Sequence, residues 1–118
     1  MSTSASNILS FKGDRDALIQ QVVSAGELVA LVIYAPWCPS CRKLSQELPS
    51  ISNDFPNVLF LKANIGEAKE LCSSFNLTAI PHIKFFTMNG NQLTELKSIT
   101  GANFANIRAM LTELCPPQ

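Results

Sequence analysis

Residues 28–48 read LVALVIYAPWCPSCRKLSQEL, an apolar run that leads through two cysteines into a stretch with helical character. The segment 28–34 is continuously apolar and rich in β-branched and aromatic side chains, which is typical of a strand buried on both faces of a sheet. We therefore expect this strand to be central. Cys38 and Cys41 then lie where the central strand passes into a helix.

The rest of the chain alternates between strand and helix patterns around this centre. We expect further strands over 8–11, 58–65, 83–87 and 92–99, and helices over 14–25, 67–75 and 103–114. The turn Asn89-Gly90-Asn91 is typical of an antiparallel hairpin, and Pro49 is expected to kink or end the helix that starts at the cysteines. The order β-α-β-α-β-α-β-β-α predicts an α/β fold with a central mixed β-sheet flanked by helices on both faces.

Length and composition predict one domain over residues 1–118, with a flexible N-terminus over 1–7 and a short tail over 115–118. Of the 118 residues 47% are hydrophobic and 15% are charged, which is enough apolar material for a core. Nine Lys and Arg balance nine Asp and Glu, so the sequence does not predict a nucleic-acid-binding surface.

The sequence also predicts no contact with a membrane and no export. The longest apolar run, residues 28–35, is far shorter than the roughly 20 residues that a spanning helix needs. The first seven residues carry neither a basic nor an apolar segment of a secretory signal, so we expect a cytoplasmic protein.

Cys38 and Cys41 form a chemically coherent pair. At a helix N-terminus, free amide groups and the positive end of the helix dipole favour the thiolate of Cys38, which is the nucleophilic form in disulfide exchange. Cys41, one turn later, can attack the resulting mixed disulfide and release the partner. The alternative is half of a zinc site, for which Cys72, His82 and Cys115 are the candidate further ligands.

With Trp37 before Cys38, Pro39 and Ser40 between the cysteines, Ile80-Pro81 ahead of the hairpin and Gly101 after it, the chain resembles the thioredoxin family from about residue 8 to residue 114. This resemblance implies the thioredoxin fold and a cis peptide bond at Pro81 facing the cysteines. It also implies a substrate groove formed by Trp37, Ile80-Pro81 and the loop at Gly101-Ala102.

Several positions depart from the family pattern. Pro39-Ser40 replaces the usual Gly-Pro between the cysteines, and the intervening pair influences the reduction potential, so reduction and oxidation both remain open as the direction of the reaction. Val32 stands where the family carries a buried aspartate that the resemblance implies takes part in proton transfer with the resolving cysteine. We therefore expect slower resolution by Cys41 than in a typical member.

Three further side chains remain to be interpreted. His82 follows Pro81, and its imidazolium stabilises the Cys38 thiolate if it lies near the sulfur; otherwise it is a half-exposed strand residue facing solvent. Cys72 is expected to be a buried core residue. Cys115 is either a thiol in a mobile tail or the site of an intermolecular disulfide.

The resemblance implies a protein-disulfide reductase in which Cys38 is the nucleophile and Cys41 the resolving thiol. It implies protein disulfides as substrates, no bound cofactor, and a thioredoxin-reductase-like enzyme that restores the dithiol at the expense of NADPH. We expect a monomer. The alternatives are a disulfide oxidase or isomerase on the same fold, and a partner- or metal-binding module with weak turnover.

Overall fold

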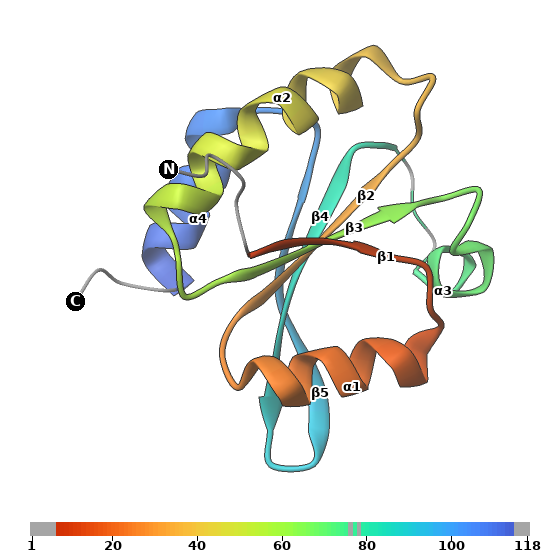
Figure 1. Cartoon of the computed structure of the whole chain (residues 1–118), viewed down its shortest axis with the longest axis vertical. Coiled ribbons are helices and arrows are strands. Elements are labelled where there is room, and N and C mark those ends of the chain that lie inside the picture. Colours follow the sequence, from red (N-terminus) through yellow and green to blue (C-terminus); the bar gives the residue numbers. More distant parts are fainter. Residues whose placement is uncertain (1–6, 76, 78, 115–118) are drawn as a thin grey trace.

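A five-stranded mixed sheet forms the centre of the molecule. In the computed structural model, which describes residues 7–75, 77 and 79–114, the strands lie in the order β1-β3-β2-β4-β5 (Figure 1). Strands β1, β3 and β2 are parallel to one another. Strand β4 is antiparallel to its neighbour β2, and β5 is antiparallel to β4. The bounds of the strands are Ile8–Phe11 for β1, Val29–Tyr34 for β2, Leu59–Asn64 for β3, His82–Asn89 for β4 and Gln92–Thr100 for β5. The expected α/β fold with the order β-α-β-α-β-α-β-β-α is confirmed.

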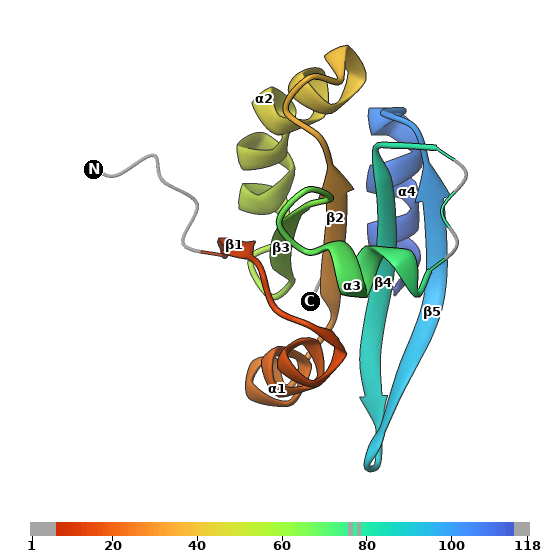
Figure 2. The same cartoon turned by 90° about the vertical axis from the view of Figure 1, so that its right-hand side faces the viewer.

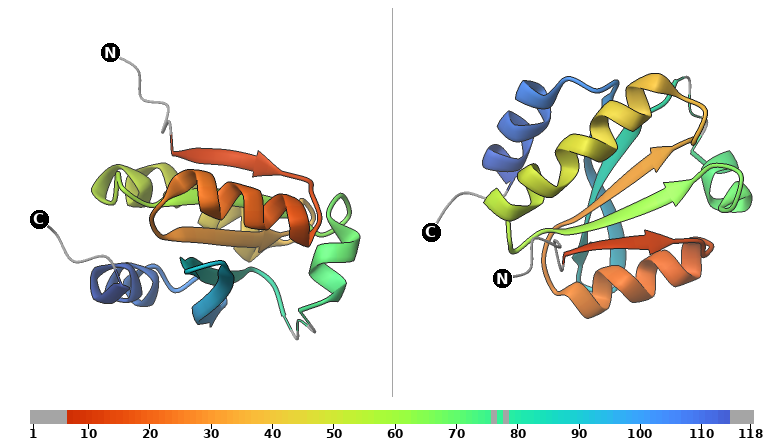
Figure 3. Two further views of the ribbon diagram at one scale, coloured as in Figure 1. Left: turned by 90° about the horizontal axis from the view of Figure 1, so that it is seen from below. Right: turned by 45° about the horizontal axis from the view of Figure 1, so that its top comes forward.

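Helices cover both faces of the sheet, which leaves β2 buried on both sides as its apolar sequence predicts. The helices are α1 (Arg15–Ala25), α2 (Pro39–Asp54), α3 (Lys69–Ser73) and α4 (Phe104–Leu114). One core joins α1 and α3 to the β2 side chains of Val29, Leu31 and Ile33, and the other joins α2 and α4 to Ala30 and Val32. Figure 3 shows α2 and α4 along one face of the sheet and α1 on the other.

Helix α2 continues through Pro49, so of the two outcomes expected for this proline, a kink or the end of the helix, the second is wrong. Proline removes one intrahelical hydrogen bond, but Ile51, beyond it, is completely buried together with Leu44 and Leu48. The apolar face of the helix therefore extends past the proline, and its burial outweighs the lost bond. The helix ends at Asp54, shortly before Pro56.

The N-terminal segment is held from Asn7 onward. The Asn7 side-chain amide donates to the carbonyl oxygens of Ser52, Phe55 and Val58 at 3.1, 3.2 and 2.9 Å. These contacts join the last residue of the predicted flexible terminus to the end of α2 and the start of β3. The rest of that prediction, the tail over 115–118 and Cys115 lie outside the described residues.

The β4–β5 hairpin places the end of β5 beside the start of β4. Gly90, at φ 65°, forms the turn with Asn91, and His82 pairs with Thr100 at the other end of the hairpin. Figure 2 shows the turn at one end of the molecule and the beginning of α2 at the opposite end. Within the described part of the chain, no helix is long and apolar enough to cross a bilayer.

Candidate active site

Cys38 caps the N-terminus of α2, directly after the strand β2 and a short turn. Its backbone N–H donates to the Ala35 carbonyl at 3.2 Å, and its Sγ accepts the backbone N–H of Cys41 at 3.2 Å. Pro39 occupies the first turn of the helix, where its missing amide donor costs no hydrogen bond. The site is thus built by the passage from the central strand into α2, as the sequence predicts.

The surroundings of Cys38 favour its thiolate. The hydrogen bond from the Cys41 thiol lowers the pKa of Cys38, and the backbone amides of Cys41 and Ser40 and the charge of Arg42 lower it further, against an opposing effect of burial. Arg42 is fixed over the same turn because its guanidinium donates to the Pro36 carbonyl at 3.2 Å. These contributions combine the helix N-terminus with one nearby cation.

Cys41 is held as a neutral thiol. Burial raises the pKa of Cys41 to about 11, and the hydrogen bond that its thiol donates to Cys38 raises it as well. Val32, which stands at the position of the family aspartate, is almost completely buried in the core under α2. The groups that shift the pKa of Cys41 include no carboxylate. Val32 has an apolar side chain and does not accept the Cys41 proton either.

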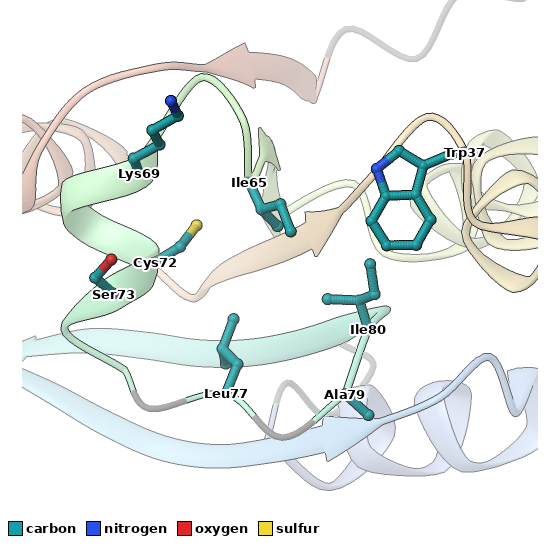
Figure 4. Close-up of a pocket in the computed structure, with 8 residues that line it drawn as sticks. All are labelled: Trp37, Ile65, Lys69, Cys72, Ser73, Leu77, Ala79 and Ile80. Carbon is teal, nitrogen blue, oxygen red and sulfur yellow. The ribbon is translucent and has the colours of Figure 1, made fainter.

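An open pocket of about 620 Å³ lies beside the cysteines, between Trp37 and helix α3 (Figure 4). Trp37 is 70% exposed and forms one wall, and Ile80 forms another. The Ile80–Pro81 peptide bond is cis, as the family resemblance predicts, and the Ile80 carbonyl oxygen lies 4.0 Å from the Cys38 Sγ. A chain segment bound in this pocket would therefore lie next to the Cys38 sulfur.

Much of the pocket wall comes from residues that the sequence analysis did not assign to a site. Its lining residues are Trp37, Ile65, Lys69, Cys72, Ser73, Leu77, Ala79 and Ile80. Three of them, Lys69, Cys72 and Ser73, belong to the five-residue helix α3, and nothing in its sequence pattern indicates that they face Trp37. Gly101 contacts the residue that follows Ile80, because its N–H donates to the Pro81 carbonyl at 2.8 Å.

Cys72 is buried, as predicted, and its sulfur is also directed toward the pocket (Figure 4). Burial raises the pKa of the Cys72 thiol, so this side chain is held neutral. It therefore contributes apolar surface to the pocket, like its neighbour Leu77.

His82 does not adopt the solvent-facing arrangement, one of the two expected from the sequence. It is only 8% exposed, so it does not face solvent, and its Nδ1 lies 3.2 Å from the Thr100 hydroxyl. Burial and the nearby charge of Lys84 lower the pKa of His82, whereas Glu95 raises it. The ring is therefore neutral at neutral pH, and it does not supply an imidazolium to Cys38.

Within the residues that the structure describes, no three His, Cys, Asp or Glu side chains gather as a metal-binding group. Of the three candidate zinc ligands, Cys115 lies outside those residues. Cys38 and Cys41 are instead engaged with each other.

A family model named Thioredoxin matches residues 11–113 of the chain. Thioredoxin from Geodia cydonium is 31% identical over 103 residues, which cover 86% of this chain and 92% of that protein. The solved structure of Trichomonas vaginalis thioredoxin superposes with a TM-score of 0.85 at 29% identity, over 91% of this chain and 96% of the other.

Fold, cysteine pair and these similarities together show that the chain belongs to the thioredoxin family. Other curated relatives are longer proteins that match in part. The chain spans 34% of the length of thioredoxin-like 2-2, chloroplastic, from Arabidopsis thaliana, to which it is 34% identical over 79 residues.

Proposed function

We propose that this protein is a thiol–disulfide oxidoreductase that reduces protein disulfides. The observation that supports this function best is the asymmetry of the cysteine pair. Cys38 lies at the end of α2 next to the pocket with its pKa lowered, whereas the pKa of Cys41, one turn deeper, is raised to about 11. Cys38 is thereby favoured as the attacking thiolate, and Cys41 stays a protonated thiol until the mixed disulfide has formed.

The reaction consists of two exchanges. The Cys38 thiolate attacks one sulfur of a substrate disulfide, which forms a mixed disulfide and releases the other substrate sulfur as a thiolate. Cys41 then loses its proton and attacks the Cys38 sulfur, which forms the Cys38–Cys41 disulfide and releases the second substrate thiolate. Two electrons pass from the cysteine pair to the substrate, one of the two protons comes from Cys41 and the other from water, and the protein ends as a disulfide.

The proton of Cys41 leaves without a buried carboxylate in this mechanism. When Cys38 becomes part of a mixed disulfide it no longer accepts the Cys41 hydrogen bond as a thiolate, which removes one of the causes that raise the pKa of Cys41. The proton then passes to water or to the departing substrate thiolate. This route is slower than transfer to a fixed base, because it relies on groups that are not held in place.

The substrates of this proposed activity are extended protein segments that enter the pocket beside Trp37 and Ile80. An NADPH-dependent reductase of the thioredoxin-reductase type would return the pair to the dithiol, and the protein itself would bind no cofactor. The prediction of a cytoplasmic, monomeric protein belongs to the same proposal.

An insulin reduction assay with dithiothreitol as the electron source tests this function. We expect turnover by the wild-type protein and its loss in Cys38→Ser and Cys41→Ser. The matched control is Cys115→Ser, because this substitution also removes one thiol from the chain but not one that takes part in the proposed exchange. Absence of turnover in the wild-type protein, or activity that survives Cys38→Ser, would contradict the proposal.

A second function, oxidation or isomerisation of disulfides, is favoured by one feature, the Pro39-Ser40 pair in the first turn of α2. Residues at these positions influence the relative stability of the thiolate and the disulfide, and hence the reduction potential. Equilibration with glutathione distinguishes the two functions. A potential near the value of about −270 mV for thioredoxin supports reduction, and one above roughly −180 mV supports oxidation or isomerisation.

A further inference from the structure

The wall of the pocket that carries Ile80 is attached to the end of strand β5 by two contacts. The Gly101 N–H donates to the Pro81 carbonyl at 2.8 Å, and the His82 Nδ1 lies 3.2 Å from the Thr100 hydroxyl. The first contact joins two backbone groups and does not titrate. The second contact involves the imidazole of a histidine, so its chemistry depends on pH.

The surroundings of the His82 ring do not stabilise its protonated form. Its Nε2 is buried, and within the described part of the chain no hydrogen-bond partner reaches it. A neutral ring leaves at Nε2 either a lone pair or one N–H without a partner, depending on the tautomer. The imidazolium always carries an N–H there, with a full positive charge and no acceptor.

The charges that act on His82 come from two strands. On β4, Lys84 lies on the same face of the sheet and is buried to a similar degree as His82, and its ammonium repels an imidazolium. On β5, Glu95 attracts an imidazolium, but its carboxylate is already paired with the Lys84 Nζ at 3.1 Å. The neighbouring strand β2 pairs the apolar Ile33 with His82. Burial is the largest cause of the lowered pKa of His82, and the repulsion by Lys84 comes second.

We propose that His82 is a positioning residue that holds the Ile80–Pro81 wall of the pocket in place while its imidazole is neutral, and that protonation of His82 releases this wall.

The release follows from the position of His82 in the chain. A protonated ring gains hydrogen bonds only if it reaches water, and it sits at the first residue of β4, directly after Pro81. Movement of this strand end carries Ile80 with it. The Ile80 carbonyl lies 4.0 Å from the Cys38 Sγ, and the Ile80 side chain faces Trp37 across the pocket, so both the nucleophile and the pocket change.

The composition of the chain allows a direct test, because it contains one histidine and one tryptophan. In the oxidised protein the pair Cys38–Cys41 is a disulfide and neither sulfur titrates. Proton NMR of the His82 ring then gives the midpoint of its protonation, and the fluorescence of Trp37 reports the pocket over the same pH range. Carboxylates ionise at about pH 4, below the usual histidine value of about 6.5.

We expect one step in the Trp37 fluorescence, with the same midpoint as the His82 resonance and below the ordinary histidine value. In His82→Asn, whose side chain can still hydrogen-bond to Thr100 but does not gain a proton, this step is lost. Fluorescence that stays flat while His82 titrates would overturn the proposal, and so would a step that persists in His82→Asn.

A second variant, Thr100→Val, keeps the histidine and removes its hydrogen-bond partner. The NMR midpoint of His82 is expected to shift, and the fluorescence midpoint is expected to shift with it. Two midpoints that separate in this variant would also overturn the proposal. Because this variant retains the titrating ring, the test stands even if His82→Asn does not fold.

The consequence for catalysis rests on the proposed function, whereas the NMR and fluorescence experiments do not. In the insulin assay, kcat/KM of the wild-type protein should fall through one more protonation step than that of His82→Asn, and the extra step should share the His82 midpoint. An inactive wild-type protein whose Trp37 fluorescence follows His82 would contradict the proposed function but support the positioning role.

Discussion

Cys38 and Cys41 carry the same side chain three residues apart, and their surroundings give them opposite tendencies. Cys38 accepts hydrogen bonds at the start of α2, where its pKa is lowered, and Cys41 is buried one turn later, where its pKa is raised. His82 shows the same principle, since burial next to Lys84 keeps it neutral. At this scale, the chemistry of a residue follows from the partners that the fold places around it.

The asymmetry of the pair predicts selective alkylation of the reduced protein by iodoacetamide. A thiol reacts as its thiolate, whose fraction grows as the pH rises toward the pKa. With a pKa of about 11 for Cys41, roughly one Cys41 thiol in ten thousand is ionised at pH 7. We therefore expect Cys38 to be modified first, and Cys41 only as the pH approaches its pKa.

Tandem mass spectrometry after partial alkylation distinguishes the two positions. Cys72 is the internal control, because burial raises its pKa without a partner cysteine. Equal rates for Cys38 and Cys41 at neutral pH would show that the pair is not asymmetric in solution.

Restoring a carboxylate with Val32→Asp is predicted to speed the attack by Cys41. A fixed base contributes on the order of 100-fold to a proton-transfer step, and Val32 lies in the core under α2, the helix that carries the cysteines. The rate is measured as the second release of thionitrobenzoate after the reduced protein meets Ellman's reagent.

The matched control is Val32→Asn, which has nearly the same shape as aspartate and does not accept the proton. Both variants should lose about 1–3 kcal/mol of stability, because each buries a polar group in an apolar core. If Val32→Asp resolves the mixed disulfide no faster than Val32→Asn, the missing carboxylate does not limit this protein.

At the scale of elements, hydrogen bonds from side chains to the backbone decide where helices and strands begin. The Asp14 carboxylate accepts the N–H of Ala17 at 3.0 Å, and Asn103 accepts that of Asn106 at 3.0 Å, so polar side chains start α1 and α4. Asn7 has a different role, because its amide joins the start of β1 to the corner between α2 and β3.

The substitution Asn7→Ala is predicted to lower the free energy of unfolding by about 1–3 kcal/mol, since three carbonyls lose their shared hydrogen-bond donor. Urea titration followed by circular dichroism measures the loss. Asn53→Ala, at an exposed position of α2, is the control and should change stability by less than about 0.5 kcal/mol. Equal effects of the two substitutions would mean that the Asn7 contacts are not formed in solution.

At the scale of the whole molecule, one sheet serves two cores. Strand β2 supplies alternating side chains to both of them, so the face under α2 and α4 and the face under α1 and α3 share the same backbone. Loss of either core should therefore unfold the other, and the chain should behave as one cooperative unit.

Leu111→Ala tests this cooperativity from the side of α4. The side chain is completely buried against the sheet, so its truncation is predicted to cost about 2–5 kcal/mol. Trp37 fluorescence and far-ultraviolet circular dichroism should report the same denaturation midpoint, although Trp37 is at the active site. The control Glu113→Ala changes an exposed side chain on the same helix and should leave the midpoint nearly unchanged. Two separate transitions would contradict the prediction of a single domain.

The fold was accessible from the sequence because its signals are local or periodic. The apolar run at 28–34 marked the central strand, the helical pattern over 14–25 marked α1, and the turn at Gly90 marked the hairpin. Pro49 misled, because a local rule about proline was outweighed by the burial of Ile51 beyond it. The contacts of Asn7 could not be predicted from the sequence, since its three partners lie 45 to 51 residues away.

The sequence by itself determined the order of the elements and placed Cys38 and Cys41 at the junction of the central strand and α2, because strand periodicity, helix capping and the spacing of the cysteines are all written within a few residues. Only the tertiary structure decided that Cys72 and Leu77 face Trp37 across a pocket, and that His82 is buried against Thr100 near Lys84. These arrangements join residues from different elements, and the burial and charge that control their ionisation exist only once the sheet and helices have packed together.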